Sequence, residues 1–247
     1  MRRFALIALG VALAVPCRAT AATDWPGVPV LMYHRVDTDV PRDPVGRDLT
    51  VVPAAFEAQL RYLQTHAIRT LTAAELVSAL ARGERPANAV VLTFDDGYQD
   101  AATSALPLLL KYGARATFFV SSGFVGTPRH VTWRDLRGMQ AAGMEIACHG
   151  TNHTDLSTLD RAGQMNEAQH CLSTFARYLG GFRAQTYAYP AGKYDATTLE
   201  IMRALGLRAA FTERPGTVRD LARPWELPRR RVRHDDALER FAALSAP

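Results

Sequence analysis

Short apolar segments alternate with segments of helical periodicity along this sequence, and the alternation limits the folds that the chain can adopt. Strands are predicted over residues 28–33, 90–94, 116–120, 144–147, 186–189 and 208–211, because each is a short apolar run. Helices are predicted over residues 72–81, 101–112, 132–142, 160–179, 197–205 and 235–244, and Phe56, Leu60 and Leu63 form a further helical face. This order predicts an α/β fold with mainly parallel strands, closed as a barrel or open and doubly wound.

The chain has 247 residues, of which 48% are hydrophobic and 21% charged, and this composition favours a well-filled core over disorder. It contains no internal repeat and no low-complexity linker, so we expect one domain after the N-terminal segment. The longest irregular segment, residues 37–50, is rich in Asp, Pro and Arg. We expect this segment to be a functional loop over one mouth of the sheet, because long loops in compact domains usually serve a function.

The N-terminus has the pattern of a signal peptide. Arg2 and Arg3 precede an apolar run over residues 4–15, and residues 19–21 (ATA) give a small-x-small cleavage pattern. We therefore expect residues 1–21 to be a signal peptide, residues 22–247 the mature domain, and the protein to be exported to the periplasm or outside the cell. A short membrane anchor is the alternative, but the apolar run is too short to span a bilayer comfortably. Lipoprotein processing at Cys17 is disfavoured because Pro16 precedes it.

Cleavage would change both the charge and the cysteine count. It would remove Arg2, Arg3 and Arg18 but no acidic residue, so the formal net charge would fall from +5 to +2. No mature patch interleaves basic and aromatic residues, and we expect no nucleic-acid partner. Cys148 and Cys171 would remain; export permits a disulfide between them, but the sequence does not show whether they are close enough.

Two adjacent carboxylates, Asp95 and Asp96, directly follow the predicted strand over residues 90–94. The carboxyl ends of parallel strands are where ligands and catalysis gather. Adjacent side chains diverge at a strand end, so one carboxylate can bind a metal while the other faces a bound water. A plain turn is the alternative, because Asp-Gly is a common loop pair.

Two histidines, His149 and His153, follow the predicted strand over residues 144–147. Their spacing of four residues would bring both rings to one side of a helical turn, which suits a single metal. With Asp96 as a third ligand, the set leaves coordination positions open, as catalytic sites do. Gly150 stands where a zinc-protease helix would carry glutamate, which excludes that class. An iron oxygenase also uses two His and one carboxylate, but strand–helix alternation and export argue against it.

Segment 93–97 (TFDDG) followed by the H-x-x-x-H pattern of His149 and His153 resembles the polysaccharide deacetylases, carbohydrate esterase family four. The resemblance spans about residues 28–232. It implies a distorted (β/α) barrel, with Asp95 as general base and Asp96, His149 and His153 as ligands of one divalent metal ion, Zn or else Co or Ni.

The chain departs from the usual family pattern in two places. Segment 187–192 (YAYPAG) lacks the Arg of the Arg-x-Pro-Tyr motif, and His234 stands in VRH where the family has Leu-x-His. Segments 31–36 (LMYHRV), 187–192 and 226–229 (ELPR) are together similar to the branch that deacetylates poly-N-acetylglucosamine in biofilms. In that branch the motif order is circularly permuted and the catalytic histidine comes from the N-terminal strand, which implies His34 as general acid. His34 as a packed strand-end residue is the alternative.

The resemblance implies hydrolysis of the acetamide groups of an acetylated amino-sugar polymer. We expect the protein to be a monomer and to have no stable membrane span after signal cleavage. In this hypothesis the backbone N–H of Ala191 holds the oxyanion, and Arg229 orients Asp95 in place of the missing Arg. Tyr189, Pro190 and Trp225 would contact the sugar, although aromatic residues more often serve packing. An O-acetyl esterase and a catalytically silent sugar-binding module are the remaining alternatives, and an intact Asp95 argues against the silent module. The sequence does not identify the polymer.

Overall fold

The computed structural model describes residues 25–183 and 185–247, so the predicted signal peptide lies outside the described residues. Most of its strands form one parallel sheet. The strands are β1 Val30–Tyr33, β2 Arg35–Val36, β3 Thr50–Val51, β4 Arg69–Leu71, β5 Ala89–Phe94, β6 Thr117–Val120, β7 Glu145–Cys148, β8 Thr186–Ala188, β9 Ala209–Phe211 and β10 Arg230–Arg231. The order in the main sheet is β10-β1-β5-β6-β7-β8-β9, with β4 paired to β5, while β2 and β3 form a separate pair.

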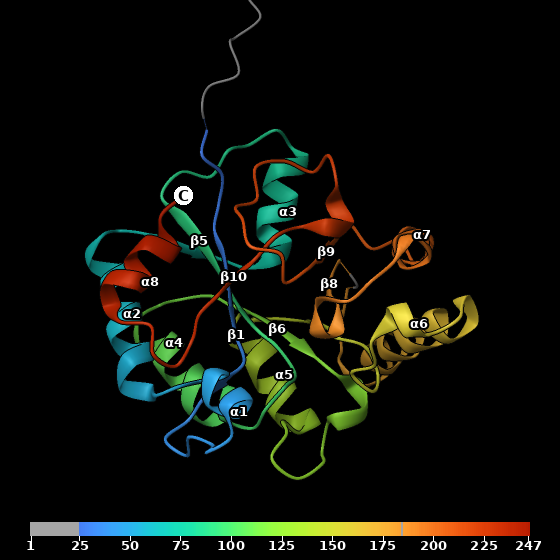
Figure 1. The fold of residues 1–247 in the computed structure, drawn as a ribbon, viewed down its shortest axis with the longest axis horizontal. Helices are drawn as coiled ribbons and strands as arrows, with labels where there is room; N and C mark the ends of the chain where they lie inside the picture. Colours follow the sequence, from blue (N-terminus) through green and yellow to red (C-terminus); the bar gives the residue numbers. More distant parts are fainter. Residues whose placement is uncertain (1–24, 184) are drawn as a thin grey trace, which may run out of the picture.

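Helices surround this sheet (Figure 1). The helices are α1 Pro44–Asp48, α2 Pro53–Thr65, α3 Ala73–Ala81, α4 Leu106–Lys111, α5 Trp133–Ala141, α6 Arg161–Tyr178, α7 Ala196–Ala204 and α8 Leu238–Ser245. The predicted start of α3 is confirmed: Thr72 and Glu75 form a capping box, in which each side chain bonds the backbone of the other.

The segment from Leu227 to Arg231 connects the two edges of the sheet. Leu227 forms a parallel bridge with Phe211 at the end of β9, and three residues later β10 pairs with β1. The sheet therefore curls into a distorted (β/α) barrel, which confirms the predicted fold class and selects the barrel over the open sheet. The same segment, from Leu227 to Arg231, places Arg229 between β9 and β1.

Alternation along the strands separates two apolar layers. Val30, Val91, Phe119, Ala147 and Phe211 belong to the inner cluster, which also packs against α3. Their strand neighbours, such as Leu31, Leu92 and Phe118, belong to the outer cluster beneath the other helices. Side chains at successive strand positions point to opposite faces, so the barrel interior is a packed core and the polar chemistry is left to its ends.

Two predicted segments differ from the structure. The helix expected over residues 101–112 is a π-helix over Ala101–Ala105 followed by α4; Pro107 lacks the N–H that would continue a regular α-helical ladder across this junction. The segment over residues 37–50 was expected to be irregular, but it contains α1. Asp43 begins α1, because its side chain accepts a hydrogen bond from Gly46 N.

Candidate active site

The polar residues singled out from the sequence lie at the carboxyl ends of the strands. Asp95 and Asp96 follow β5, His149 follows β7, and His34 follows β1. Because all strands of the main sheet run parallel, these residues share one edge of the barrel. The sheet thus brings together side chains that are far apart in the sequence.

Three potential metal ligands converge at this edge. Nε2 of His153 lies 3.2 Å and Nε2 of His149 lies 3.4 Å from Oδ1 of Asp96. That oxygen is buried and, within the described residues, accepts no hydrogen bond. Two ligands held about 2.0–2.2 Å from one tetrahedral metal lie roughly 3.3–3.5 Å apart. The spacing and the unsatisfied oxygen therefore fit a divalent cation.

A hydrogen bond on the side of the ring away from Asp96 sets the orientation of His149. Its Nδ1 lies 2.8 Å from the backbone oxygen of Ala188, at the end of β8. A carbonyl accepts only from a protonated nitrogen, so the neutral ring carries its proton on Nδ1 and keeps the lone pair of Nε2 for a metal. His149 is 1% exposed, and the ring has no room to turn away.

A tight loop, and not the helical turn expected from the spacing, joins His149 to His153. Gly150 and His153 both have positive φ, 76° and 56°, which folds the loop back so that both rings face Asp96. A Cβ at residue 150 would lie 3.2 Å from Pro190 and 3.3 Å from Glu167. Glycine is therefore required here for both its conformation and its size.

Helix α6 holds this loop through two of its residues, Glu167 and Cys171. The carboxylate of Glu167 accepts hydrogen bonds from Thr151 N at 2.8 Å, from Asn152 N at 3.0 Å and from Asn152 Nδ2 at 2.6 Å. Cys148, the residue before His149, forms a disulfide with Cys171 on α6, a pairing that the sequence had left open. Sequence reasoning missed Glu167, because a glutamate within a helix carries no pattern of its own.

Asp95 is held by a fully buried arginine. Nη1 and Nη2 of Arg229 each lie 2.7 Å from one carboxylate oxygen of Asp95, and Arg229 also donates to Thr93 Oγ1 and to Thr212 O. Burial by itself would raise the pKa of Asp95, but the charge and the hydrogen bonds of Arg229 lower it below the ordinary value. The carboxylate is therefore ionised at neutral pH, and its orientation is fixed.

His34 lies beside this pair and is 8% exposed. The backbone N–H of Asp95 donates to the oxygen of Tyr33 at 3.0 Å, which keeps the end of β1 next to the end of β5. Burial lowers the pKa of His34 below its ordinary value, although the charges of Asp96 and Asp95 act to raise it. His234 is held elsewhere, because its Nδ1 contacts the oxygen of Thr50 at 2.7 Å.

The aromatic residues expected to contact sugar are largely engaged in packing. Tyr189 is fully buried, stacks on Tyr194 at 4.8 Å and donates its hydroxyl to the oxygen of Trp225. This burial contradicts a stacking role for the Tyr189 ring. Trp225 donates its indole N–H to Leu207 O and packs on the outer cluster. Sugar contacts by Trp225 and Pro190 stay predictions.

Residues 82–210 match the family model for polysaccharide deacetylase. The chain belongs to the polysaccharide deacetylase family. YxkH of Bacillus subtilis (strain 168) is 32% identical over 192 residues, which are 76% of this chain and 65% of that relative. Poly-beta-1,6-N-acetyl-D-glucosamine N-deacetylase of Staphylococcus aureus (strain MRSA252) is 26% identical over 78% of this chain and 71% of its own.

A solved structure of another deacetylase has the same fold over almost the whole of this chain. The Streptococcus pyogenes deacetylase PplD, in complex with acetate, superposes with a TM-score of 0.84 and 29% identity, covering 90% of this chain and 99% of that one. The single-domain barrel is therefore common to both proteins.

Proposed function

We propose that this deacetylase is a metal-dependent hydrolase that removes N-acetyl groups from a GlcNAc-containing polysaccharide. The observation that carries the proposal is the convergence of Asp96, His149 and His153 beside an Asp95 whose carboxylate is locked by Arg229. A purely structural site would have no use for a second, separately oriented carboxylate at the same edge.

Asp96, His149 and His153 are the residues that would hold the metal. A divalent cation, Zn or else Co or Ni, supplies two things when bound: a water whose pKa falls toward about 7, and polarisation of the acetyl carbonyl. Glu167 and Ala188 serve the same site by fixing the two imidazoles.

The remaining roles fall to residues around this centre. Asp95 acts as the general base and takes the proton of the attacking water. His34 acts as the general acid and protonates the leaving sugar nitrogen. It lies close to both carboxylates, and their charges favour its protonated form against the effect of burial. The backbone N–H of Ala191 holds the developing oxyanion; Ala191 is exposed and follows the end of β8 in a left-handed conformation.

The proposal extends to substrate and location. The likeness to the Staphylococcus aureus poly-beta-1,6-N-acetyl-D-glucosamine N-deacetylase supports an amino-sugar polymer as substrate and a place in the biofilm branch of the family. Among the described residues, no helix has the length and apolar character needed to cross a bilayer. We propose that residues 1–21 direct export and that residues 22–247 act as a monomer.

Acetate release after metal reconstitution tests the proposal. Apoprotein is loaded with Zn, Co or Ni and assayed on N-acetylated and O-acetylated polymers of matched length. We expect metal-dependent release from N-acetylglucosamine polymers. Release from O-acetyl substrates alone would make the protein an esterase, and binding without release under every metal would make it a sugar-binding module.

A further inference from the structure

A groove lined by arginines begins at the edge of the candidate active site. It has a volume of about 680 Å³, and its lining includes Arg229, Arg230, Arg231, Arg233, Arg240 and a single acidic residue, Glu213. Strand β10 and helix α8 contain three of these arginines, Arg230, Arg231 and Arg240. The two elements are adjacent in Figure 1. We call this feature the cationic groove.

Two of its arginines are not neutralised by a carboxylate. Arg230 donates to the backbone oxygens of Gly216, Leu244 and Ala246 and to a threonine hydroxyl, all neutral acceptors. Arg240 is exposed, and no carboxylate of the described residues lies within 4.0 Å of it. Burial and, to a lesser extent, the charge of Arg240 lower the pKa of Arg230.

The other arginines of the groove have acidic partners. Arg231 pairs with Glu213 at 2.7 Å, Arg233 pairs with Asp48 at 2.8 Å, and Arg229 pairs with Asp95. The groove therefore keeps a local excess of positive charge at Arg230 and Arg240. Guanidinium groups suit carboxylates and phosphates, because their planar fork can donate two parallel hydrogen bonds.

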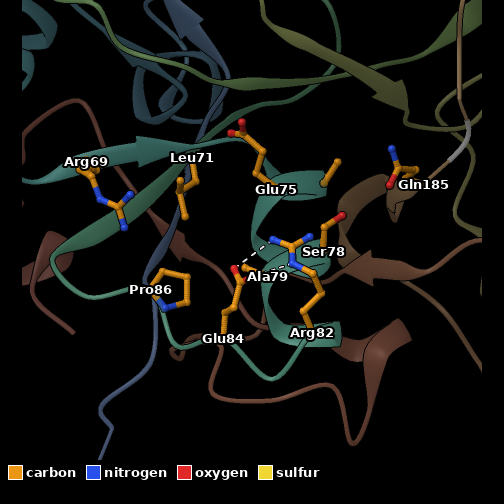
Figure 2. A pocket seen from close by; sticks show the side chains of 10 residues that line it. Arg69, Leu71, Glu75, Ser78, Ala79, Arg82, Glu84, Pro86 and Gln185 are labelled. Carbon is orange, nitrogen blue, oxygen red and sulfur yellow. Dashed lines mark hydrogen bonds and ion pairs between the residues drawn. The ribbon is translucent and has the colours of Figure 1, made fainter.

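A second cavity has no such excess of arginines over acidic residues in its lining. This cavity lies between β4 and α3 and has a volume of about 380 Å³. Its lining includes two arginines, Arg69 and Arg82, and two glutamates, Glu75 and Glu84 (Figure 2). Arg82 and Glu84 form an ion pair across it at 2.6 Å. Positive and negative residues are equal in number there, so that cavity offers no comparable attraction for an anion.

The groove adjoins the site at one buried residue, Arg229. Arg229 lines the groove and also holds Asp95, while the charge of Arg231 acts on His34. A polymer whose acetamide lies at Asp95 can therefore place its neighbouring sugars in the groove.

We propose that the cationic groove binds an anionic group, a carboxylate or a phosphate, on a sugar next to the one that is deacetylated. The inference rests on the proposed function and narrows its substrate to an acidic glycan. Deacetylation leaves an ammonium group, which the groove repels. Binding should therefore weaken as a polymer loses its acetyl groups.

Charge reversal at one exposed position tests this without disturbing the site. Arg240→Glu on α8 is compared with Arg203→Glu on α7, another exposed helical arginine, so both variants change the net charge equally. Equilibrium binding is measured by titration calorimetry on three probes: an alternating N-acetylglucosamine–glucuronic acid polymer, an N-acetylglucosamine polymer carrying phosphodiesters, and a neutral N-acetylglucosamine oligomer.

We expect Arg240→Glu to weaken binding of at least one acidic probe about tenfold, the effect of one lost charge-assisted hydrogen bond, and to leave the neutral probe unchanged. The acidic probe that is affected identifies carboxylate or phosphate as the ligand. Equal effects of the two variants, or equally tight binding of the neutral probe by the unmodified protein, would overturn the proposal.

Acetate release separates this inference from the proposed function. In one outcome, the protein releases acetate efficiently from the neutral oligomer, Arg240→Glu does so equally well, and acidic groups on the polymer bring no gain. This outcome would reject the role of the groove and support the deacetylase activity. Loss of acidic-probe binding in Arg240→Glu, with no acetate released from any polymer, would keep the groove and reject the deacetylase.

Discussion

Carboxylates lie at both ends of this barrel, but their surroundings are opposite. At the amino ends of the strands, Glu145 accepts hydrogen bonds from Ala74 N, Thr117 Oγ1 and Thr186 Oγ1. At the carboxyl ends, Oδ1 of Asp96 is buried and, among the described residues, accepts none. Burial raises the pKa of Glu145, whereas at Asp96 the two nearby imidazoles outweigh burial and hold the pKa well below its ordinary value.

This difference in hydrogen bonding distinguishes Glu145, which stabilises the fold, from Asp96, which is placed to bind a ligand. Glu145 joins α3 to β6 and β8 and closes the base of the barrel with its hydrogen bonds complete. A buried polar atom without a partner costs about 1–3 kcal/mol, so a fold retains one where a ligand completes it. The five expectations below test this contrast, from the largest effect to the smallest.

Replacing a ligand should remove the metal itself. We expect His149→Ala to lose bound metal and all measurable acetate release, because only two of the three protein ligands remain. Metal at a hundred times its Kd stabilises a protein by about 2.7 kcal/mol, so a chelator should lower the Tm of the unmodified protein but not of His149→Ala. Elemental analysis and thermal unfolding measure both effects. The exposed His170→Ala is the control, and a full metal content in His149→Ala would contradict the assignment.

Replacing the base should stop catalysis while the metal stays. We expect Asp95→Asn to lower kcat by about 10²–10⁴-fold, the usual contribution of a general base, with metal content unchanged. Glu145→Gln at the opposite end makes the same chemical change and should leave kcat within about twofold, since Glu145 contacts no site residue. Near-normal turnover in Asp95→Asn would mean that another group takes the proton.

Replacing the acid should have a smaller effect. For His34→Ala we expect a drop in kcat of about 10²-fold, near the lower end for a general acid, because water can partly replace a proton donor. Metal content should not change, and steady-state kinetics on an N-acetylglucosamine oligomer measures the loss. A leaving group that needs no protonation should be hydrolysed almost normally by His34→Ala. Unchanged kinetics on every substrate would leave the role to solvent or His234.

Much of the fold could be predicted because the relevant signals are local. The apolar runs of β5 and β6 and the capping box of α3 each lie within a few residues, so the α/β alternation was readable. The two-residue strand β10 was missed, because an Arg-Arg pair has no strand pattern and owes its conformation to pairing with β1. Closure of the barrel depends on that pairing, which is why the strand–helix pattern alone left barrel and open sheet undecided and only the family resemblance implied the barrel.

The candidate site divides in the same way. Asp95, Asp96, His149 and His153 stand in short motifs at strand ends, where sequence alone indicates chemistry. The contacts that orient them come from distant residues such as Glu167 and Ala188, which carry no motif. Tyr189 was misassigned to sugar stacking because an aromatic residue beside a motif has no local sign of whether it faces the core or the solvent.

Replacing a residue that holds the loop between the two histidine ligands should weaken metal binding without preventing it. We expect Glu167→Gln to weaken metal binding about 10–100-fold, as loss of a group that orients a metal ligand commonly does. Glutamine offers one acceptor oxygen where Glu167 uses two, one for the backbone N–H groups of Thr151 and Asn152 and one for the Asn152 side chain. Competition with a chromophoric chelator measures the affinity. The exposed Glu200→Gln on α7 is the control. An unchanged affinity would show that the disulfide at Cys148 suffices to hold the loop.

The smallest effect on the free energy of unfolding is expected for Glu145→Gln, because the carboxylate of Glu145 has hydrogen-bond donors around it. Because burial raises the folded-state pKa of Glu145, the ionised form is disfavoured in the native state. This cost builds up as the pH rises from the ordinary pKa of glutamate to the raised pKa. Near pH 4 both Glu145 and a glutamine are neutral, so Glu145→Gln should change the free energy of unfolding by only about 1 kcal/mol. Toward pH 7 the difference should shift in favour of the variant, in denaturant titrations of both proteins. A shift in the opposite direction would mean that the charge of Glu145 stabilises the barrel. The hydrogen bonds to Glu145 would then offset the cost of burying its charge, as Arg229 does for Asp95.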